Sequence, residues 1–401
     1  MTNIFFTKDE YRARWRKVED EMKRRGYDVA VIWAKGSGAY ERYGDVLWMT
    51  NYYSAHSGQE ADNELWRARS FSAVVMQIGK TPALHMDEPL EPRDFISTRR
   101  VKWHMNPIEG VAEDLKQRKV RGKVALVGTD FFPCKYMAEL QKRRPGLEFV
   151  PADDLVASVR QVKSPAELDI FREAGQTASK AMNAMMKDLI AGKSEAEAAG
   201  SGAKACIKGG GIPYLLRVAH GKGTELFNFS RNNLTGFEDS VPRKGDLVRG
   251  WLMGPMHYGY GYLDPGRTAV CGGKPTRKQR QLIEACAGIV NGVIEKIRPG
   301  VSAHELAREG DRLYEAAGGG KVSDQASLQW PLYGHVNDFH FENPMYGLKT
   351  AKKTDRLHEN MVCSSEAFLT WEGVGAAGFE QNMIIKKEGV EILTTSPMIW
   401  H

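Results

Sequence analysis

A repeated pattern of helix starts constrains the fold of this chain more than any other feature. Ser164-Pro-Ala-Glu167 and Ser194-Glu-Ala-Glu197 have the form of capping boxes, in which Ser or Thr accepts from the backbone three residues on and Glu or Gln reaches back. Thr276-Arg-Lys-Gln279 and Ser302-Ala-His-Glu305 repeat the pattern about a hundred residues later. Two pairs of helices with the same spacing predict a domain made of two similar halves.

The segments after each helix pair also correspond. A glycine-rich stretch leads to a Pro-led strand, at 213–215 in the first half and 331–333 in the second, and then to a hairpin turn. Gly245 takes the turn position in the first half and Asn360 in the second, as expected for a left-handed backbone conformation. The repeat predicts two halves related by a pseudo-two-fold axis, with chemistry placed between them.

The region before this repeat predicts a smaller domain. Thr7 opens a helix that runs to Arg25 and ends at Gly26, and strand-like runs follow at 29–33, 71–77 and 124–127, with a helix at 135–144. A chain of 401 residues exceeds the ~250–300 residues that one core serves. We therefore expect an α/β (α+β) protein with an N-terminal α/β domain over 1–158 and a C-terminal domain over 159–401.

Composition excludes several kinds of partner. The net charge is only +6 and the basic residues are scattered, so neither nucleic acid nor a membrane surface is predicted as a partner. The first residues contain no signal-peptide core, and no run approaches the ~20 apolar residues of a membrane span. Five widely spaced cysteines without a CxxC pair indicate reduced thiols, which predicts a cytoplasmic protein.

Four residues of the C-terminal domain are of the types that bind hard metal ions. Asp264 lies in a predicted hairpin, His335 beside a strand, and Glu366 and Glu380 within apolar strands. A carboxylate in a buried strand is costly unless it is paired, protonated or bound to a metal. Two glutamates on paired strands can converge on one point, and oxygen ligands with one imidazole suit Mn, Fe, Co or Zn. These residues are the candidate metal ligands.

The same segments carry a family resemblance. Asp264 followed by Arg267-Thr268, then Gly334-His335, then Glu366 and Glu380, match in order the signatures of the pita-bread family. That family includes creatinase, aminopeptidase P, prolidase and methionine aminopeptidase. The resemblance covers roughly 160–401, and more loosely an N-terminal segment at 45–51. It implies the pita-bread fold for the C-terminal domain and metal-binding roles for the four residues.

One family position departs from the pattern. Eleven residues before Asp264, where the dinuclear members have an Asp that binds a second metal, this chain has Met253. The resemblance therefore implies one metal ion, held by Asp264, His335, Glu366 and Glu380, instead of a pair. Creatinase works without metal, so a metal-free site is also open.

Two histidines are candidates for moving a proton, together with Glu366 and Glu380 as catalytic carboxylates. His340 matches the family's second histidine, which contacts substrate. The alternative is an ordinary surface histidine in a loop. His220 lies near the place of creatinase's catalytic histidine, but the count along the family pattern falls on Asn228. His220 is thus divided between a catalytic and a structural role.

Aromatic and cationic residues near these motifs are candidates for substrate binding. Tyr258, Tyr262 and Trp330 flank the ligand motifs and suggest an aromatic wall, although most such residues are ordinarily core. In creatinase-like dimers the small domain of one subunit leans over the partner's site. That resemblance implies a homodimer in which Arg42 and Tyr53 contact a small-molecule substrate, against the plainer possibility of surface or domain-interface residues.

Together these features predict a creatinase-like hydrolase. The expected reaction cleaves a C–N bond of a small non-peptide or modified amino-acid substrate by acid–base chemistry, with a single metal ion or none. A lyase on the same scaffold is the first alternative. An Xaa-Pro-type dipeptidase and a catalytically inactive binding module are the others.

Overall fold

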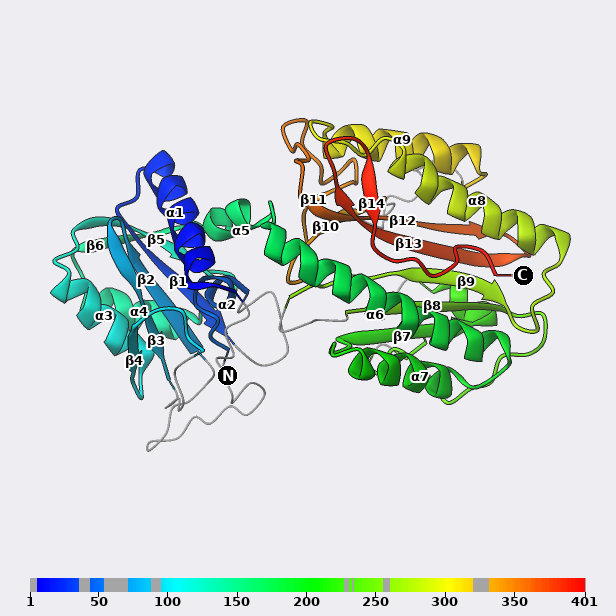
Figure 1. Ribbon diagram of the computed structural model, residues 1–401, viewed down its shortest axis with the longest axis horizontal. Helices are drawn as coiled ribbons and strands as arrows, with labels where there is room; N and C mark the ends of the chain where they lie inside the picture. Colours follow the sequence, from blue (N-terminus) through cyan, green and yellow to red (C-terminus); the bar gives the residue numbers. More distant parts are fainter. Residues whose placement is uncertain are drawn as a thin grey trace. The chain divides into compact units, whose positions relative to one another are not determined.

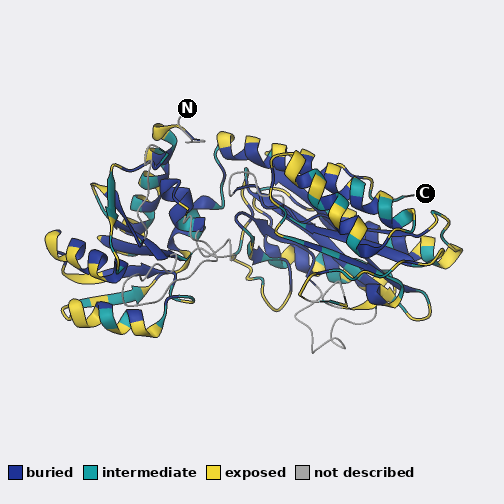
Figure 2. Cartoon of the chain, turned by 90° about the horizontal axis from the view of Figure 1, so that it is seen from below, coloured by how far each residue is buried: buried dark blue, intermediate teal, exposed yellow. Residues whose placement is uncertain are grey.

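The computed structural model describes residues 6–35, 44–53, 71–87, 95–226, 231–232, 234–254, 260–319 and 332–400 (Figure 1). The chain divides into two compact units, Met1–Arg160 and Gln161–His401, each with its own sheet. Each unit has its own buried interior: Figure 2 shows buried residues concentrated in the strands of both sheets and exposed residues along the outer faces of the helices.

The N-terminal unit is a mixed sheet flanked by helices, in the order β4-β3-β2-β1-β5-β6. Strand β1 is antiparallel to β2 and parallel to β5, and helices α3 and α4 pack against the face that carries Val29, Val31 and Trp33. The strands are β1 (Val29–Lys35), β2 (Phe71–Gln77), β3 (Lys80–Met86), β4 (Arg100–Trp103), β5 (Gly122–Val127) and β6 (Leu147–Pro151). The helices are α1 (Lys8–Arg25), α2 (Gly44–Thr50), α3 (Pro107–Gln117), α4 (Cys134–Arg143) and α5 (Asp154–Arg160).

A chain of ionisable side chains joins β3, the residue that follows β4, and α3 in this unit. The His104 ring stacks on the His85 ring, with 3.2 Å between His104 Nε2 and His85 Nδ1. His85 Nε2 lies 3.2 Å from the buried Asp114 Oδ2, which also accepts from Arg118 Nε at 2.9 Å. Burial, followed by the charges of His85 and Lys102, lowers the pKa of His104 to about 4. The fold therefore holds this histidine neutral.

We expect this unit to lose stability on acidification. The unfolded chain takes up a proton on His104 near pH 6.5 and the folded chain only near pH 4, so the unfolded state binds more protons in between. Stability is fully present above pH 6.5 and falls by about 1–2 kcal/mol as the pH drops to 4, after allowance for solvent screening. Thermal unfolding of the wild type and His104→Gln across pH 4–8 measures this, and identical profiles for the two proteins would contradict it.

Four capped helices form the helical layers of the C-terminal unit. They are α6 (Pro165–Ile190), α7 (Glu195–Lys208), α8 (Arg277–Ile294) and α9 (Ala303–Ala316). Ser164, Ser194, Thr276 and Ser302 are their N-caps, and both hydrogen bonds of the capping box form at each. All four helix starts predicted for this unit are confirmed, as is the start at Thr7 in the N-terminal unit.

The sheet of this unit shows the duplication directly, because its strands run β11-β10-β12-β13-β9-β8-β7, with β14 paired to β13. Each half contributes two helices, a strand and a hairpin, and the halves meet where β13 pairs with β9. Figure 1 shows α6 and α7 along the β7–β9 half, and α8 and α9 along the β12–β13 half. The strands are β7 (Leu215–His220), β8 (Leu247–Met253), β9 (Gly266–Val270), β10 (His335–Asn337), β11 (Phe341–Met345), β12 (Val362–Trp371), β13 (Gly375–Ile385) and β14 (Val390–Ile392). A 3₁₀ turn (Gly221–Glu225) follows β7.

The hairpin turns agree with the sequence and the two Pro-led strands do not. Gly245 has φ 94° and Asn360 φ 66°, so both take the left-handed conformation predicted for them. The strand expected at 213–215 begins only at Leu215, the first residue of β7. Of the strand expected at 331–333, residue 331 lies outside the described residues, residues 332–334 are irregular, and β10 begins at His335. Gly334 has φ 138°, a value that interrupts a regular strand and redirects the chain into His335.

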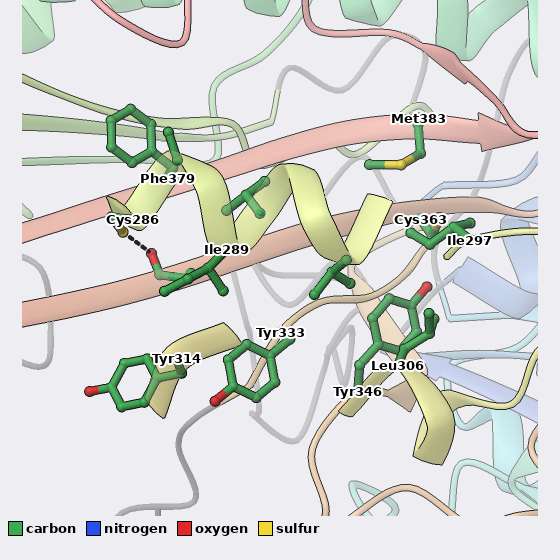
Figure 3. Packing of buried hydrophobic residues seen from close by; sticks show 14 of the residues in the cluster. Cys286, Ile289, Ile297, Leu306, Tyr314, Tyr333, Tyr346, Cys363, Phe379 and Met383 are labelled. Atoms are coloured by element: carbon green, nitrogen blue, oxygen red, sulfur yellow. Dashed lines mark hydrogen bonds between the residues drawn. The ribbon is translucent and has the colours of Figure 1, made fainter. Parts of the chain in front are cut away.

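The core of the second half lies between α8, α9 and one face of β12 and β13. Figure 3 shows Ile289 of α8, Ile297 just after α8 and Leu306 of α9 in one cluster with Cys363 of β12 and with Phe379 and Met383 of β13. Alternate residues of these strands, including Glu366 and Glu380, therefore occupy the opposite face. No helix in the described part of the chain is both long and apolar enough to cross a bilayer.

Candidate metal centre

The candidate site lies on a single row of residues that crosses the sheet. Arg217 on β7 pairs with Trp251 on β8, Trp251 with Gly266 on β9, Gly266 with Glu380 on β13, and Glu380 with Glu366 on β12. Cross-strand partners share one face of a sheet. The pairing thus places the two glutamates side by side at the junction of the two halves.

His335 meets three carboxylates at this point. Its Nε2 lies 3.3 Å from Asp264 Oδ2, 3.3 Å from Glu380 Oε1 and 3.7 Å from Glu366 Oε1, and all four side chains are buried. His335 Nδ1 lies 3.2 Å from the carbonyl of Val336. A carbonyl can only accept, so Nδ1 carries the proton of the neutral ring and Nε2 faces the carboxylates.

Two asparagines hold Asp264 in place. Asn337 Nδ2 donates to Asp264 Oδ1 at 2.9 Å, and Asn382 Nδ2 donates to the same oxygen at 2.8 Å. The other oxygen, Oδ2, is left directed at His335. Asn337 is two residues after His335 and Asn382 two residues after Glu380, so each amide shares a strand with a candidate ligand.

The electrostatics of the cluster favour the binding of a cation. Burial raises the pKa of Glu366 and Glu380 well above the ordinary range, and neighbouring carboxylates raise it further. Burial alone would raise the pKa of Asp264 too, but the charge of His335 and several hydrogen bonds outweigh it and lower that pKa to about 2. Burial would lower the pKa of His335, yet Asp264 and Glu366 raise it.

A divalent cation fits this donor set. Asp264, His335 and Glu380 each offer a ligand atom, and these atoms lie within 4.8 Å of one another. The buried Glu380 Oε1 has no hydrogen-bond donor among the described residues. Three carboxylates with one imidazole suit Mn, Fe, Co or Zn, and a cation would remove the carboxylate repulsion. The ligand assignment itself stays a prediction.

The sequence count missed the residue of β8 that reaches the carboxylates. Met253 pairs with Leu215 at the end of the strand, while Trp251 Nε1 donates to Glu380 Oε2 at 3.0 Å. Asn337 and Asn382 were missed as well. The alternation of β8 could have indicated Trp251, because residues 251 and 253 share a face.

His340 lies in an aromatic group. Its ring centroid is 4.8 Å from that of Tyr262, 5.8 Å from that of Tyr214 and 4.1 Å from that of Phe341. Phe341 in turn lies 5.5 Å from the ring of His335. The structure thus brings His340 and Tyr262 together and links both to the cluster through Phe341, although their catalytic and substrate-binding roles stay predictions.

His220 does not join the cluster. It pairs with Val248, and the neighbouring pair Leu216–Leu252 packs into the α6–α7 core, so His220 lies on the face opposite to Arg217 and Trp251. His220 Nδ1 lies 2.7 Å from Glu195 Oε1. Burial raises the pKa of Glu195, and His220 partly offsets this. This position supports the structural role more than the catalytic one.

The remaining substrate-binding predictions cannot be placed at the cluster. Arg42, Tyr258 and Trp330, and also Asn228, lie outside the described residues. Tyr53 belongs to the N-terminal unit, where it is 38% exposed. The contacts of Arg42 and Tyr53 with a partner's site, and the homodimer that they assume, stay predictions.

Comparison with known proteins identifies the family. The model of metallopeptidase family M24 matches residues 169–387. The chain belongs to this family. The Xaa-Pro dipeptidase of Pyrococcus horikoshii is 26% identical over 279 residues, 65% of this chain and 70% of that protein. The probable dipeptidase PepE of Mycobacterium tuberculosis is 28% identical over 196 residues, 48% and 50% of the two chains.

Solved structures show the same fold. The prolidase of P. horikoshii superimposes with a TM-score of 0.76 over 96% of this chain and 99% of that chain, at 20% identity. Aminopeptidase P of E. coli gives 0.75 over 97% and 95%, at 17% identity. The pita-bread fold predicted for this M24 protein is confirmed.

Membership of M24 also bears on the reaction. The protein is an enzyme of the hydrolase class, in a family of metal-binding peptidases. The preference for creatinase among the family's members is not supported, because the curated relatives above are named dipeptidases. The dipeptidase alternative therefore has more support than a non-peptide substrate.

Proposed function

We propose that this M24 protein is a metal-dependent dipeptidase of the Xaa-Pro type, which hydrolyses the amide C–N bond of a dipeptide. The observation that carries the proposal is the buried group of three carboxylates around His335 Nε2. The names of the curated relatives support the substrate class. Asp264, His335, Glu366 and Glu380 would hold the ion.

Each group of the site has a proposed task. A bound divalent cation polarises a carbonyl and lowers the pKa of water. Glu366, whose Oε1 makes the longest of the three carboxylate contacts with His335 Nε2, accepts the proton of the attacking water. His340, held among Tyr214, Tyr262 and Phe341, donates a proton to the leaving amine. Tyr262 forms part of the wall that positions the substrate.

One observation favours the second candidate, a hydrolase of a small non-peptide or modified amino-acid substrate. The residue of β8 that faces Glu380 is Trp251, a neutral donor. Met253, at the position where the resemblance implies a carboxylate and a second ion, is apolar as well. The acid–base residues would be the same for both substrates.

A metal analysis with a substrate panel tests the proposal. We expect protein purified without chelator to contain a divalent ion, which Asp264→Ala and Glu380→Ala both lose while remaining folded. We also expect the wild type to cleave Xaa-Pro dipeptides at least ~10²-fold faster than either variant does. Metal-loaded protein that leaves dipeptides intact but cleaves N-substituted amino-acid amides would overturn the dipeptidase proposal in favour of the second candidate. Folded protein without metal would contradict the metal-dependent mechanism.

A further inference from the structure

We propose that the indole of Trp251 takes the place of a second cation, so that this site is built to hold a single ion. The inference rests on the proposed metal-dependent function and deepens it. It concerns the number of ions and the residue that limits it, which the sequence count attributed to Met253.

The carboxylate oxygens divide into an inner and an outer set. Glu380 directs Oε1 at His335 and uses Oε2 to accept from Trp251 Nε1 at 3.0 Å. Asp264 directs Oδ2 at His335 and uses Oδ1 to accept from both Asn337 and Asn382. Two metal ions that share these carboxylates would need Glu380 Oε2 and Asp264 Oδ1 as ligands. Neutral N–H donors occupy them instead, and both lone pairs of Asp264 Oδ1 are used.

The position of the indole is fixed by its surroundings. Trp251 is buried and stacks on Phe368, with ring centroids 4.8 Å apart and an interplanar angle of 20°. A Cβ atom on Gly266 would lie 2.3 Å from the indole, so this cross-strand neighbour must be glycine for the ring to lie there. The contact with Glu380 is therefore part of the packing of the sheet.

The buried side chain of Arg249 lies on the same face of the sheet as Trp251 and Glu380. Arg249 shares the face of Trp251, and its guanidinium lies 5.6 Å from the ring centroid of Phe368. Arg249 Cδ would lie 3.2 Å from a Cβ on Gly378, two residues before Glu380 on β13. Arg249 Nη1 donates to the carbonyl of Thr224 at 2.7 Å, which anchors the charge. A second cation at Glu380 Oε2 would therefore meet the N–H of Trp251 instead of a free carboxylate oxygen.

Counting bound ions in matched variants tests the inference. We expect wild-type protein saturated with Mn²⁺ and freed of excess to contain one ion per chain, with the electron paramagnetic resonance of isolated Mn²⁺. Trp251→Asp replaces the donor with a ligand, so we expect two ions and an exchange-coupled spectrum. Met253→Asp adds the same carboxylate at the position given by the sequence count, and we expect it to keep one ion.

A second measurement covers the case in which Trp251→Asp does not fold. The indole Nε1–H signal of Trp251 can be assigned in the ¹⁵N-labelled wild type, because it is absent from Trp251→Phe. We expect this proton to remain slow to exchange with solvent at two equivalents of Zn²⁺. Loss of that protection on loading would overturn the inference.

The remaining outcomes separate this inference from the proposed function. Two ions in the wild type, or one ion in folded Trp251→Asp, would overturn the role of Trp251 and leave the metal-dependent hydrolase intact. A wild type that binds no Mn²⁺ under saturation would contradict the proposed function itself. Two ions in Trp251→Asp with one in both the wild type and Met253→Asp is the result that we expect.

Discussion

Replacing Glu366 with glutamine is expected to lower kcat/KM by about 10²- to 10⁴-fold, the usual contribution of a general base. Glutamine preserves the shape of the side chain beside Glu380 but can neither accept a proton nor supply charge to an ion. Because burial and neighbouring carboxylates raise the pKa of Glu366, we expect the metal-free variant to be at least as stable as the wild type. Steady-state kinetics and thermal unfolding measure the two effects.

Glu391→Gln is the matched control for this variant. Glu391 lies on the neighbouring strand β14 and pairs with Arg172 at 2.7 Å, away from the cluster. We expect its kcat/KM to stay within about twofold of the wild type, as for a partly exposed ion pair without a catalytic role. A Glu366→Gln protein that is folded and retains more than a tenth of the activity would remove Glu366 from the proposed mechanism.

Gly334→Ala is expected to destabilise the protein by about 3–5 kcal/mol, from backbone strain and overpacking together. Gly334 has φ 138°, and an added Cβ would lie 2.1 Å from the carbonyl oxygen of Ser364 and 2.7 Å from the ring of Tyr346. The carbonyl belongs to β12 and cannot move without disturbing the strand that carries Glu366. Because His335 follows directly, we also expect metal affinity to fall.

Denaturant unfolding of Gly334→Ala beside Gly389→Ala separates the two causes. Gly389 also has a positive φ, 72°, but nothing lies within 4 Å of an added Cβ. The control therefore measures backbone strain alone, about 1–2 kcal/mol. Equal midpoints for the two variants would show that the close approach of Gly334 to β12 does not limit the fold.

A distinction between local and long-range information explains which predictions succeeded. Capping boxes are set by residues three apart, so Ser164, Ser194, Thr276 and Ser302 could be assigned as helix starts without knowledge of the tertiary fold. The same holds for the left-handed turn at Asn360. The buried strands around Glu366 and Glu380 were also evident, because they are apolar runs with one charge each.

Positions that depend on strand pairing were harder to predict from the sequence. A count of eleven residues from Asp264 gave Met253, but the pairing of β8 with β9 puts Trp251 opposite Gly266 and against Glu380. His220 was near the expected place along the chain. The alternation of β7 nevertheless turns it to the α6–α7 side, toward Glu195.

The sequence by itself determined the family, the duplicated architecture and the types of residue available to bind a metal. Only the tertiary structure decided which atoms face one another: one oxygen each of Asp264 and Glu380 toward His335, and the other toward N–H donors. The physical reason is that ligand types and caps are properties of a residue and its neighbours. The direction of a side chain in a sheet follows from the register of strands far apart in the chain, where a shift of one residue reverses the face.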